Sequence, residues 1–146
     1  MKKTIIVILS ILIICVIVVT IGVSENNKKI IKISQLNNEY EQYLDKEIYG
    51  TDVATIINKI IDKNNKNEIT KNSEGVYIQN NTNSIKAEIQ FMYNDETIVH
   101  PIEVIYNRGL NSFISNFNLT KFKIIDMQYH EKTKQVSKIV FQQLEP

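Results

Sequence analysis

Twenty consecutive residues near the N-terminus, 4–23, carry no charged side chain. As a helix they would extend about 30 Å at a rise of about 1.5 Å per residue, which matches the hydrocarbon core of a bilayer. A helix in a soluble core needs one polar face, and this run has none. We therefore expect residues 1–23 to form a transmembrane segment, with 4–23 inside the membrane.

Two fates are open for this segment. A cleaved signal peptide has an apolar core of about 7–15 residues, followed by a cleavage site with small residues. The run here is longer, and Thr20-Ile21-Gly22 is a poor cleavage site. A retained signal anchor is therefore favoured, with cleavage as the alternative. Cys15 does not fit a lipoprotein signal, because Ile14 before it is large and the apolar run continues past it.

The orientation of the anchor is weakly marked by charge. Lys2 and Lys3 precede the apolar run, and Lys28, Lys29 and Lys32 follow it. Positive charges on both sides reduce the force of the positive-inside rule. A very short N-terminal tail before a long C-terminal domain is typical of an uncleaved signal anchor. We therefore expect a cytoplasmic N-terminus and an extracytoplasmic C-terminal domain at the cell membrane.

The charge of the remaining chain excludes one class of partner. After residue 23 there are 15 basic and 16 acidic groups, a net charge of −1. Binding to nucleic acid needs many basic groups on one face, and Arg108 is the only arginine in the chain. Ile, Lys and Asn supply 60 of the 146 residues, which is typical of an AT-rich bacterial genome. Asparagine-rich stretches therefore carry little functional weight by themselves.

Residues 24–48 are predicted to form a membrane-proximal amphipathic helix that Gly50 ends. Its apolar residues recur every three or four positions, which places them on one stripe of a helix. We expect Leu36, Tyr40 and Tyr43 in this stripe to contact a protein partner or a second copy of the chain. The alternative is that the stripe covers the domain's own sheet.

Residues 49–146 are predicted to form a small α+β domain. The clearest element is a helix over 51–63, where Thr51 is the expected N-cap and apolar residues recur at helical spacing. A polar connection is expected over 62–73. Alternation predicts a hairpin of strands 75–79 and 84–93 around a turn at 80–83.

The second half of this domain is predicted to contain one helix and a second hairpin. The helix would run from Pro101 to Phe117; the alternative is a strand over 98–106 and a shorter helix after Gly109. Strands are expected over 122–130 and 136–144, with a bulge where Ile124 and Ile125 adjoin. The order after the anchor is ααββαββ. We expect a four-stranded antiparallel sheet with helices packed on one face.

No pattern in the chain indicates an active site, a metal site or a cofactor site. His100 and His130 are expected at exposed turns or strand ends, and Cys15 lies in the apolar run, so no nucleophile–histidine pair or zinc set is expected. Residues 62–73 do not fit a calcium loop, because Lys66 stands where a ligand would be needed. We therefore expect a protein that is not an enzyme, has no cofactor and contains no metal.

Two resemblances bear on the class of protein. Residues 49–62 and 129–138 resemble blocks found in small bacterial proteins that have one membrane anchor; this resemblance implies no activity and no site residue. The general plan also resembles type IV pilin-like subunits, which have a long apolar N-terminal helix followed by an antiparallel sheet. Such subunits have a leader that ends in Gly before the apolar run and a Glu within it. Here Gly22 lies at the end of the run and not before it, and no Glu lies within the run.

The expected function is that of a membrane-anchored extracytoplasmic module that binds a partner or supports an envelope assembly. The ligand is not specified by the residues. The first alternative is a pilin-like or secreted subunit that is processed at its N-terminus. A more remote alternative is an extracytoplasmic hydrolase, against which the lack of a reactive set of residues argues.

Overall fold

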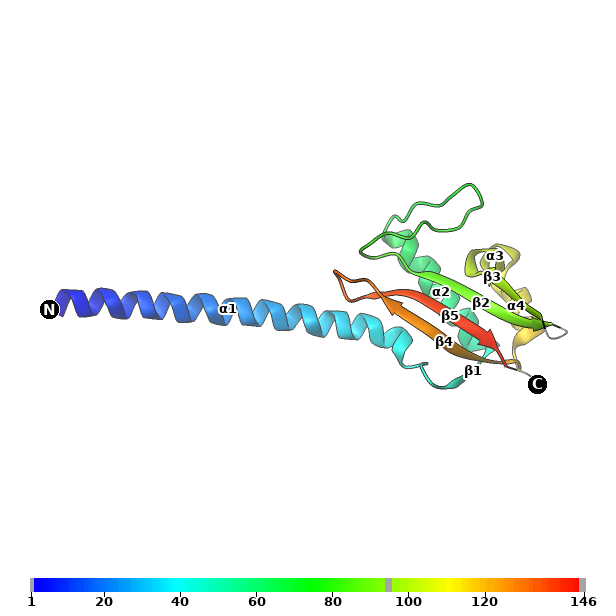
Figure 1. Cartoon of the computed structure of the whole chain (residues 1–146), viewed down its shortest axis with the longest axis horizontal. Coiled ribbons are helices and arrows are strands. Elements are labelled where there is room, and N and C mark those ends of the chain that lie inside the picture. Colours follow the sequence, from blue (N-terminus) through cyan, green and yellow to red (C-terminus); the bar gives the residue numbers. More distant parts are fainter. Residues whose placement is uncertain (1, 94–95, 145–146) are drawn as a thin grey trace. The chain divides into compact units, whose positions relative to one another are not determined.

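The computed structural model describes residues 2–93 and 96–144. The chain divides into two units, residues 1–36 and 37–146. The first unit contains most of helix α1 (Lys2–Glu41), a single continuous helix (Figure 1). The last turn of α1 belongs to the second unit, which we call the α+β domain. The compact domain therefore begins at Asn37 and not at residue 49.

The α+β domain contains five strands and three further helices. In chain order these are β1 (Glu47–Tyr49), α2 (Gly50–Lys66), β2 (Lys86–Tyr93), β3 (Glu96–Pro101), α3 (Ile102–Arg108), α4 (Leu110–Phe117), β4 (Lys121–Tyr129) and β5 (Val136–Gln143). The α+β class is as predicted. A long connection, with little regular structure among its residues, joins α2 to β2 (Figure 1).

The sheet corrects the prediction of four antiparallel strands. It has five strands in the order β1-β4-β5-β2-β3, and it is mixed because β2 and β5 run parallel. The other neighbours are antiparallel. The strand expected over 75–79 is not part of the sheet. Within that segment Tyr77 makes only an isolated antiparallel bridge, to Lys71. Strand β2 instead forms its hairpin with β3, so that Ile89 lies opposite His100.

Helix α2 confirms the predicted helix and corrects its start. Its apolar stripe is fully buried, as the spacing predicted: Val53, Ile56, Ile57, Ile60 and Ile61. The helix begins at Gly50, which was expected to end the preceding helix; α1 ends earlier, at Glu41. The backbone N–H of Tyr49 donates to the Asp52 carboxylate at 3.1 Å, which satisfies a group at the helix start.

The helix predicted over 101–117 is broken into α3 and α4 at Gly109. Gly109 has φ of +98°, a conformation that side chains disfavour and that a helix cannot contain. The alternative expectation was partly right, since a strand, β3, precedes α3 and ends at Pro101. The antiparallel β4–β5 hairpin confirms the prediction, with a shift of register between Ile124 and Asp126 at the expected bulge.

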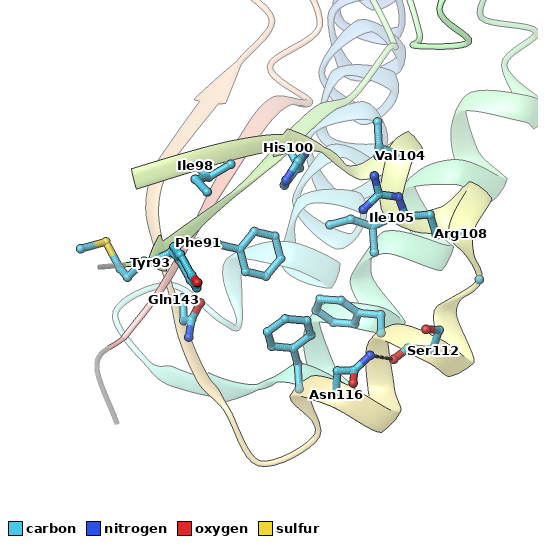
Figure 2. A pocket seen from close by; sticks show the side chains of 14 residues that line it. Phe91, Tyr93, Ile98, His100, Val104, Ile105, Arg108, Ser112, Asn116 and Gln143 are labelled. Carbon is cyan, nitrogen blue, oxygen red and sulfur yellow. Dashed lines mark hydrogen bonds between the residues drawn. The ribbon is translucent and has the colours of Figure 1, made fainter. Parts of the chain in front are cut away.

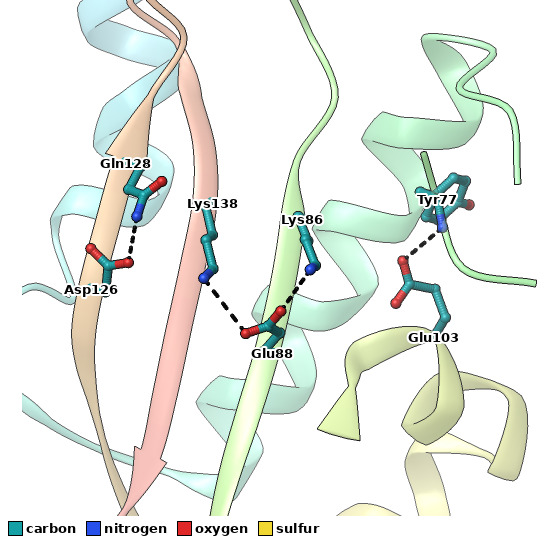
Figure 3. A network of polar contacts seen from close by, with 7 residues as sticks. All are labelled: Tyr77, Lys86, Glu88, Glu103, Asp126, Gln128 and Lys138. Carbon is teal, nitrogen blue, oxygen red and sulfur yellow. Dashed lines mark hydrogen bonds and ion pairs between the residues drawn. The ribbon is translucent and has the colours of Figure 1, made fainter. Parts of the chain in front are cut away.

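Helices α2, α3 and α4 cover one face of the sheet (Figure 1). Beneath them Ala87 and Ile89 of β2 and Ile139 and Phe141 of β5 have no exposed area. Burying the larger of these side chains, Ile89, Ile139 and Phe141, contributes about 1.5–3 kcal/mol each to folding. The opposite face carries Glu88, 2.8 Å from the Lys86 ammonium and 3.6 Å from that of Lys138 (Figure 3).

Candidate functional site

The three predicted contact residues lie in different environments. Tyr40 is completely buried, and its ring belongs to the core of the α+β domain. Tyr43 is half-buried and packs against that core, and Leu36 is half-buried. A side chain without exposed area has none to offer a partner. Tyr40 therefore fits the alternative prediction, in which the apolar stripe packs against the chain's own domain.

The aromatic ring of Tyr40 also faces a cation. The Lys63 ammonium lies 5.5 Å from the ring centroid, a cation–π distance. Burial, together with the charges of Glu39 and Asp62, raises the pKa of Tyr40. Its hydroxyl makes no hydrogen bond to any residue that the structure describes. Tyr40 is therefore a neutral, structural residue of the domain.

A pocket of about 440 Å³ opens between the β2–β3 hairpin and helices α3 and α4 (Figure 2). Its volume falls within the range of about 300–1,000 Å³ that is usual for small-molecule sites. Strand β2, strand β3, both helices and the end of β5 contribute side chains to it. The residues that line it are Phe91, Met92, Tyr93, Ile98, His100, Val104, Ile105, Arg108, Gly109, Ser112, Phe113, Asn116, Phe117 and Gln143.

Aromatic rings form much of the pocket wall. The ring centroids of Phe91 and Phe117 are 5.1 Å apart, as are those of Phe113 and Phe117. The His100 ring meets Phe91 edge-on, with centroids 5.9 Å apart. These distances are typical of favourable aromatic pairs. Phe91 and Phe117 are only partly buried, so their rings retain area that a ligand would cover.

A few polar groups stand at the edge of this apolar wall. Arg108 is exposed at the end of α3, and Ser112 and Asn116 lie on α4 (Figure 2). The Asn116 side-chain amide donates to the Ser112 carbonyl at 2.8 Å, which fixes its orientation. No acidic residue stands among the described lining residues, and Arg108 makes no ion pair with any residue that the structure describes. The pocket therefore combines an apolar body with one guanidinium.

The two histidines depart from the expected exposure. His100 is half-buried at the pocket, so it is more than a strand-end residue. His130 is buried, and its Nε2 lies 2.8 Å from the Ser84 carbonyl oxygen. The His130 N–H donates to the Gln135 carbonyl, and the His130 carbonyl accepts from the Lys134 N–H, in the turn between β4 and β5. The alternation pattern marked His130 as a strand end but gave no sign of this tertiary contact.

A buried carboxylate on α3 faces away from the pocket lining. Glu103 is 3 % exposed, and its Oε1 accepts a hydrogen bond from the Tyr77 N–H at 3.2 Å (Figure 3). The Tyr77 hydroxyl in turn bonds to the Asn65 side chain. Burial, and to a lesser extent the charge of Glu103, raise the pKa of Tyr77. Glu103 thus ties the connection between α2 and β2 to α3.

Comparison with protein-family models, with curated proteins and with solved structures finds no match to this chain. The site is therefore described by its own geometry. Within residues 2–93 and 96–144, no three His, Cys, Asp or Glu side chains lie together as a metal-binding group. What the described geometry provides is a shaped apolar pocket with a cationic edge.

Proposed function

We propose that this chain is a single-pass membrane protein whose α+β domain binds a small ligand outside the cytoplasm. The observation that carries the binding part is the pocket at α3 and α4, with its partly exposed Phe91 and Phe117. Partly exposed aromatic rings in a concave site are typical of ligand-binding surfaces. The proposed role is binding within an envelope assembly.

The membrane part of the proposal is supported by α1. This helix is long and apolar enough to cross a bilayer. The large apolar side chains between residues 11 and 23 are each more than half exposed. Hydrocarbon would cover this apolar surface, which is costly to leave in water. A cleaved signal sequence has the same features. One measurement, the mass of the mature protein, therefore distinguishes a retained anchor from the secreted and pilin-like alternatives.

The polar groups at the pocket favour binding over catalysis. Ser112, Asn116 and Arg108 can orient a ligand. Among the described lining residues, no hydrogen bond joins a nucleophile to a general base, an arrangement that hydrolysis by a serine or cysteine requires. Leu36 and Tyr43, which retain exposed area, are the residues proposed to contact a protein partner or a second copy of the chain. Tyr40 is excluded from this contact because it is buried.

The intact mass of the protein extracted from its native membrane tests the anchor. A mass near 16.9 kDa in the membrane fraction, resistant to alkaline extraction, is the expected result. Recovery in the medium without about two dozen N-terminal residues would contradict the anchor and support a secreted protein. Loss of only a few residues before the apolar run would instead support the pilin-like alternative.

Cysteine labelling tests the orientation. Cys15 is the only cysteine, so C15S provides a background without thiols. Glu74 and Glu131 are exposed residues of the α+β domain, and each is replaced by cysteine in turn. We expect both positions to react with a membrane-impermeant maleimide in intact cells. Reaction only after the membrane has been permeabilised would place the domain in the cytoplasm and overturn the proposed orientation.

A further inference from the structure

We propose that the pocket binds a small organic monoanion, with its carboxylate held by Arg108 and its apolar body against Phe91, Phe113 and Phe117. This inference rests on the proposed function, because it takes the pocket as the binding site. It adds the chemical class of the ligand. The size of the pocket, the nature of its wall and its one guanidinium each favour this class of ligand.

The size of the pocket favours an organic molecule over a simple ion. A volume of about 440 Å³ is far larger than a metal ion or a phosphate group requires. Most of the wall is carbon: Ile98, Val104 and Ile105 add aliphatic surface to the phenylalanine rings. Covering such a wall stabilises a complex in proportion to the apolar surface removed from water, before the costs of association. The body of the ligand is therefore apolar.

The arrangement of the rings favours a flat body. Phe91 comes from β2, whereas Phe113 and Phe117 lie four residues apart on α4 and therefore on one face of that helix. The Phe91 ring is tilted by 43° to that of Phe117, and the His100 ring by 61° to that of Phe91. A further aromatic ring placed among these rings gains edge-to-face and offset contacts. Alkyl chains gain only the area term.

The charge at the edge favours an anion. Arg108 is the only arginine in the chain, and no described acidic residue lines the pocket with it. Glu103, the acid on the same helix, is buried and accepts from the Tyr77 N–H instead. A guanidinium presents two parallel N–H groups, which match the two oxygens of one carboxylate. One such group suits a monoanion, whereas a nucleotide with several charges would call for more cations.

The test uses the full chain in lipid nanodiscs, titrated calorimetrically with 2-naphthoate and with neutral 2-naphthamide. Titrations of empty nanodiscs are subtracted to remove partition into lipid. We expect 2-naphthoate to bind at least about tenfold more tightly than 2-naphthamide. In Arg108→Gln this preference is expected to vanish. Lys59→Gln removes an equal charge from an exposed position of α2 outside the pocket, and the preference should survive in that variant.

A second pair of measurements tests the apolar body. Phe117→Leu keeps the Cβ that packs at Gly50 but removes the ring, and it should weaken both naphthyl probes several-fold. Decanoate, an alkyl monoanion, should bind more weakly than 2-naphthoate yet retain its dependence on Arg108. Near-ultraviolet circular dichroism of the tyrosines, all seven of which lie in the α+β domain, confirms that each variant is folded.

The outcomes separate this inference from the proposed function. Equal binding of 2-naphthoate and 2-naphthamide, unchanged in Arg108→Gln and weakened in Phe117→Leu, would overturn the anion and leave the binding pocket. No binding of any probe up to about 1 mM, which corresponds to about −4 kcal/mol, would overturn both. A protein that is released from the membrane but prefers 2-naphthoate would overturn the anchor alone.

Discussion

The side-chain amide of Asn64 pairs with both backbone groups of Ile85. Its Nδ2 donates to the Ile85 carbonyl at 2.8 Å, and its Oδ1 accepts from the Ile85 N–H at 2.8 Å. Asn64 has no exposed area, and Ile85 is 1 % exposed. The amide therefore does for this residue what a neighbouring strand would do. It joins helix α2 to the start of β2 across the long connection between them.

Asn37 makes the same kind of pair at the start of β5, the strand parallel to β2. Its Nδ2 donates to the Lys134 carbonyl at 2.8 Å, and its Oδ1 accepts from the Val136 N–H at 3.0 Å. Two buried asparagines thus hold chain segments that enter the parallel pair β2 and β5. Backbone groups buried without partners are costly, so these contacts fix where both strands begin.

Replacing Asn64 by alanine should destabilise the domain. The change leaves the Ile85 N–H and carbonyl buried without their partner, at about 1–3 kcal/mol for each group, so a loss of about 2–6 kcal/mol is expected. Urea unfolding of the full chain, followed by tyrosine circular dichroism, measures it. Asn58→Ala is the matched control, since Asn58 is exposed on the same helix. A loss as small as that of the control would contradict the role of Asn64.

The abundance of asparagine in this chain makes these two residues hard to distinguish in the sequence. A composition rich in Asn makes each one resemble an ordinary surface residue, and the sequence pattern places Asn64 in the polar connection over 62–73. The residue in fact lies within α2, which extends to Lys66. Its partner, Ile85, is 21 positions away. No periodic pattern reports a side-chain bond over that separation.

Gly50→Ala should also destabilise the domain, through a collision. A Cβ at this position would lie 2.0 Å from the Phe117 carbonyl oxygen, so α2 and α4 would have to move apart. Overpacking of this kind costs about 1–3 kcal/mol or more. Thr51→Ala, at the exposed neighbouring residue, is the control. The two unfolding midpoints in urea compare them. Equal midpoints would show that the helix ends tolerate separation without cost.

Helices and strands with a regular hydrophobic repeat were predictable from the sequence. The elements against which they pair or pack were not. The stripe from Val53 to Ile61 predicted α2, and the adjacent Ile124 and Ile125 predicted the bulge in β4. The parallel pairing of β2 with β5 is set by non-local packing, and alternation along one strand contains no information on its neighbour. The segment around Tyr77 reads as a strand, yet its polar groups bond to Asn65 and Glu103 instead of a sheet.

Glu88 should make the stability of the domain depend on pH in the acid range. Its hydrogen bond to Lys86, aided by the charges of Lys86 and Lys138, lowers the pKa of Glu88 although burial opposes this (Figure 3). A carboxyl with a lowered folded-state pKa stabilises the protein above the unfolded value of about 4.3. That contribution is lost as the pH falls through the folded-state pKa.

The Glu88→Gln variant isolates this effect. The difference in free energy of unfolding between wild type and variant should be largest near neutral pH and should shrink at about pH 3. Glu131→Gln, at an exposed turn residue, should show no such dependence. Urea titrations at both pH values measure the differences. A gap that stays constant across this range would mean that the lysines do not stabilise the Glu88 carboxylate.

The pocket could not be predicted from the sequence either, because it too depends on contacts between distant elements. Helical spacing places Phe113 and Phe117 on one helix face, and alternation places Phe91 on the same strand face as Ala87 and Ile89. Whether such faces meet without a gap depends on how the helix and the sheet are placed. The break at Gly109 sets the start of α4, and Arg108 stands beside it. In the sequence, a single arginine argues only against nucleic-acid binding.

The pair of Tyr129 and Glu41 provides a titration that can be read directly. The Tyr129 hydroxyl donates to Glu41 Oε1 at 2.8 Å. Partial burial, this hydrogen bond and the charge of Glu41 raise the pKa of Tyr129 to about 12. The neutral phenol is favoured in the folded state, so its contribution to stability is complete below the ordinary tyrosine pKa of about 10. It is lost as the pH rises from there towards 12.

Glu41→Gln should therefore lower the pKa of Tyr129 towards the ordinary tyrosine value, because the variant keeps an acceptor but removes the negative charge. The Tyr129 Cζ chemical shift, followed by NMR against pH and assigned with Tyr129→Phe, measures the change. Glu74→Gln alters an equal charge in the exposed connection before β2 and should leave the titration in place. An unchanged pKa in Glu41→Gln would show that burial alone raises it, and that the end of α1 does not hold Tyr129 through this contact.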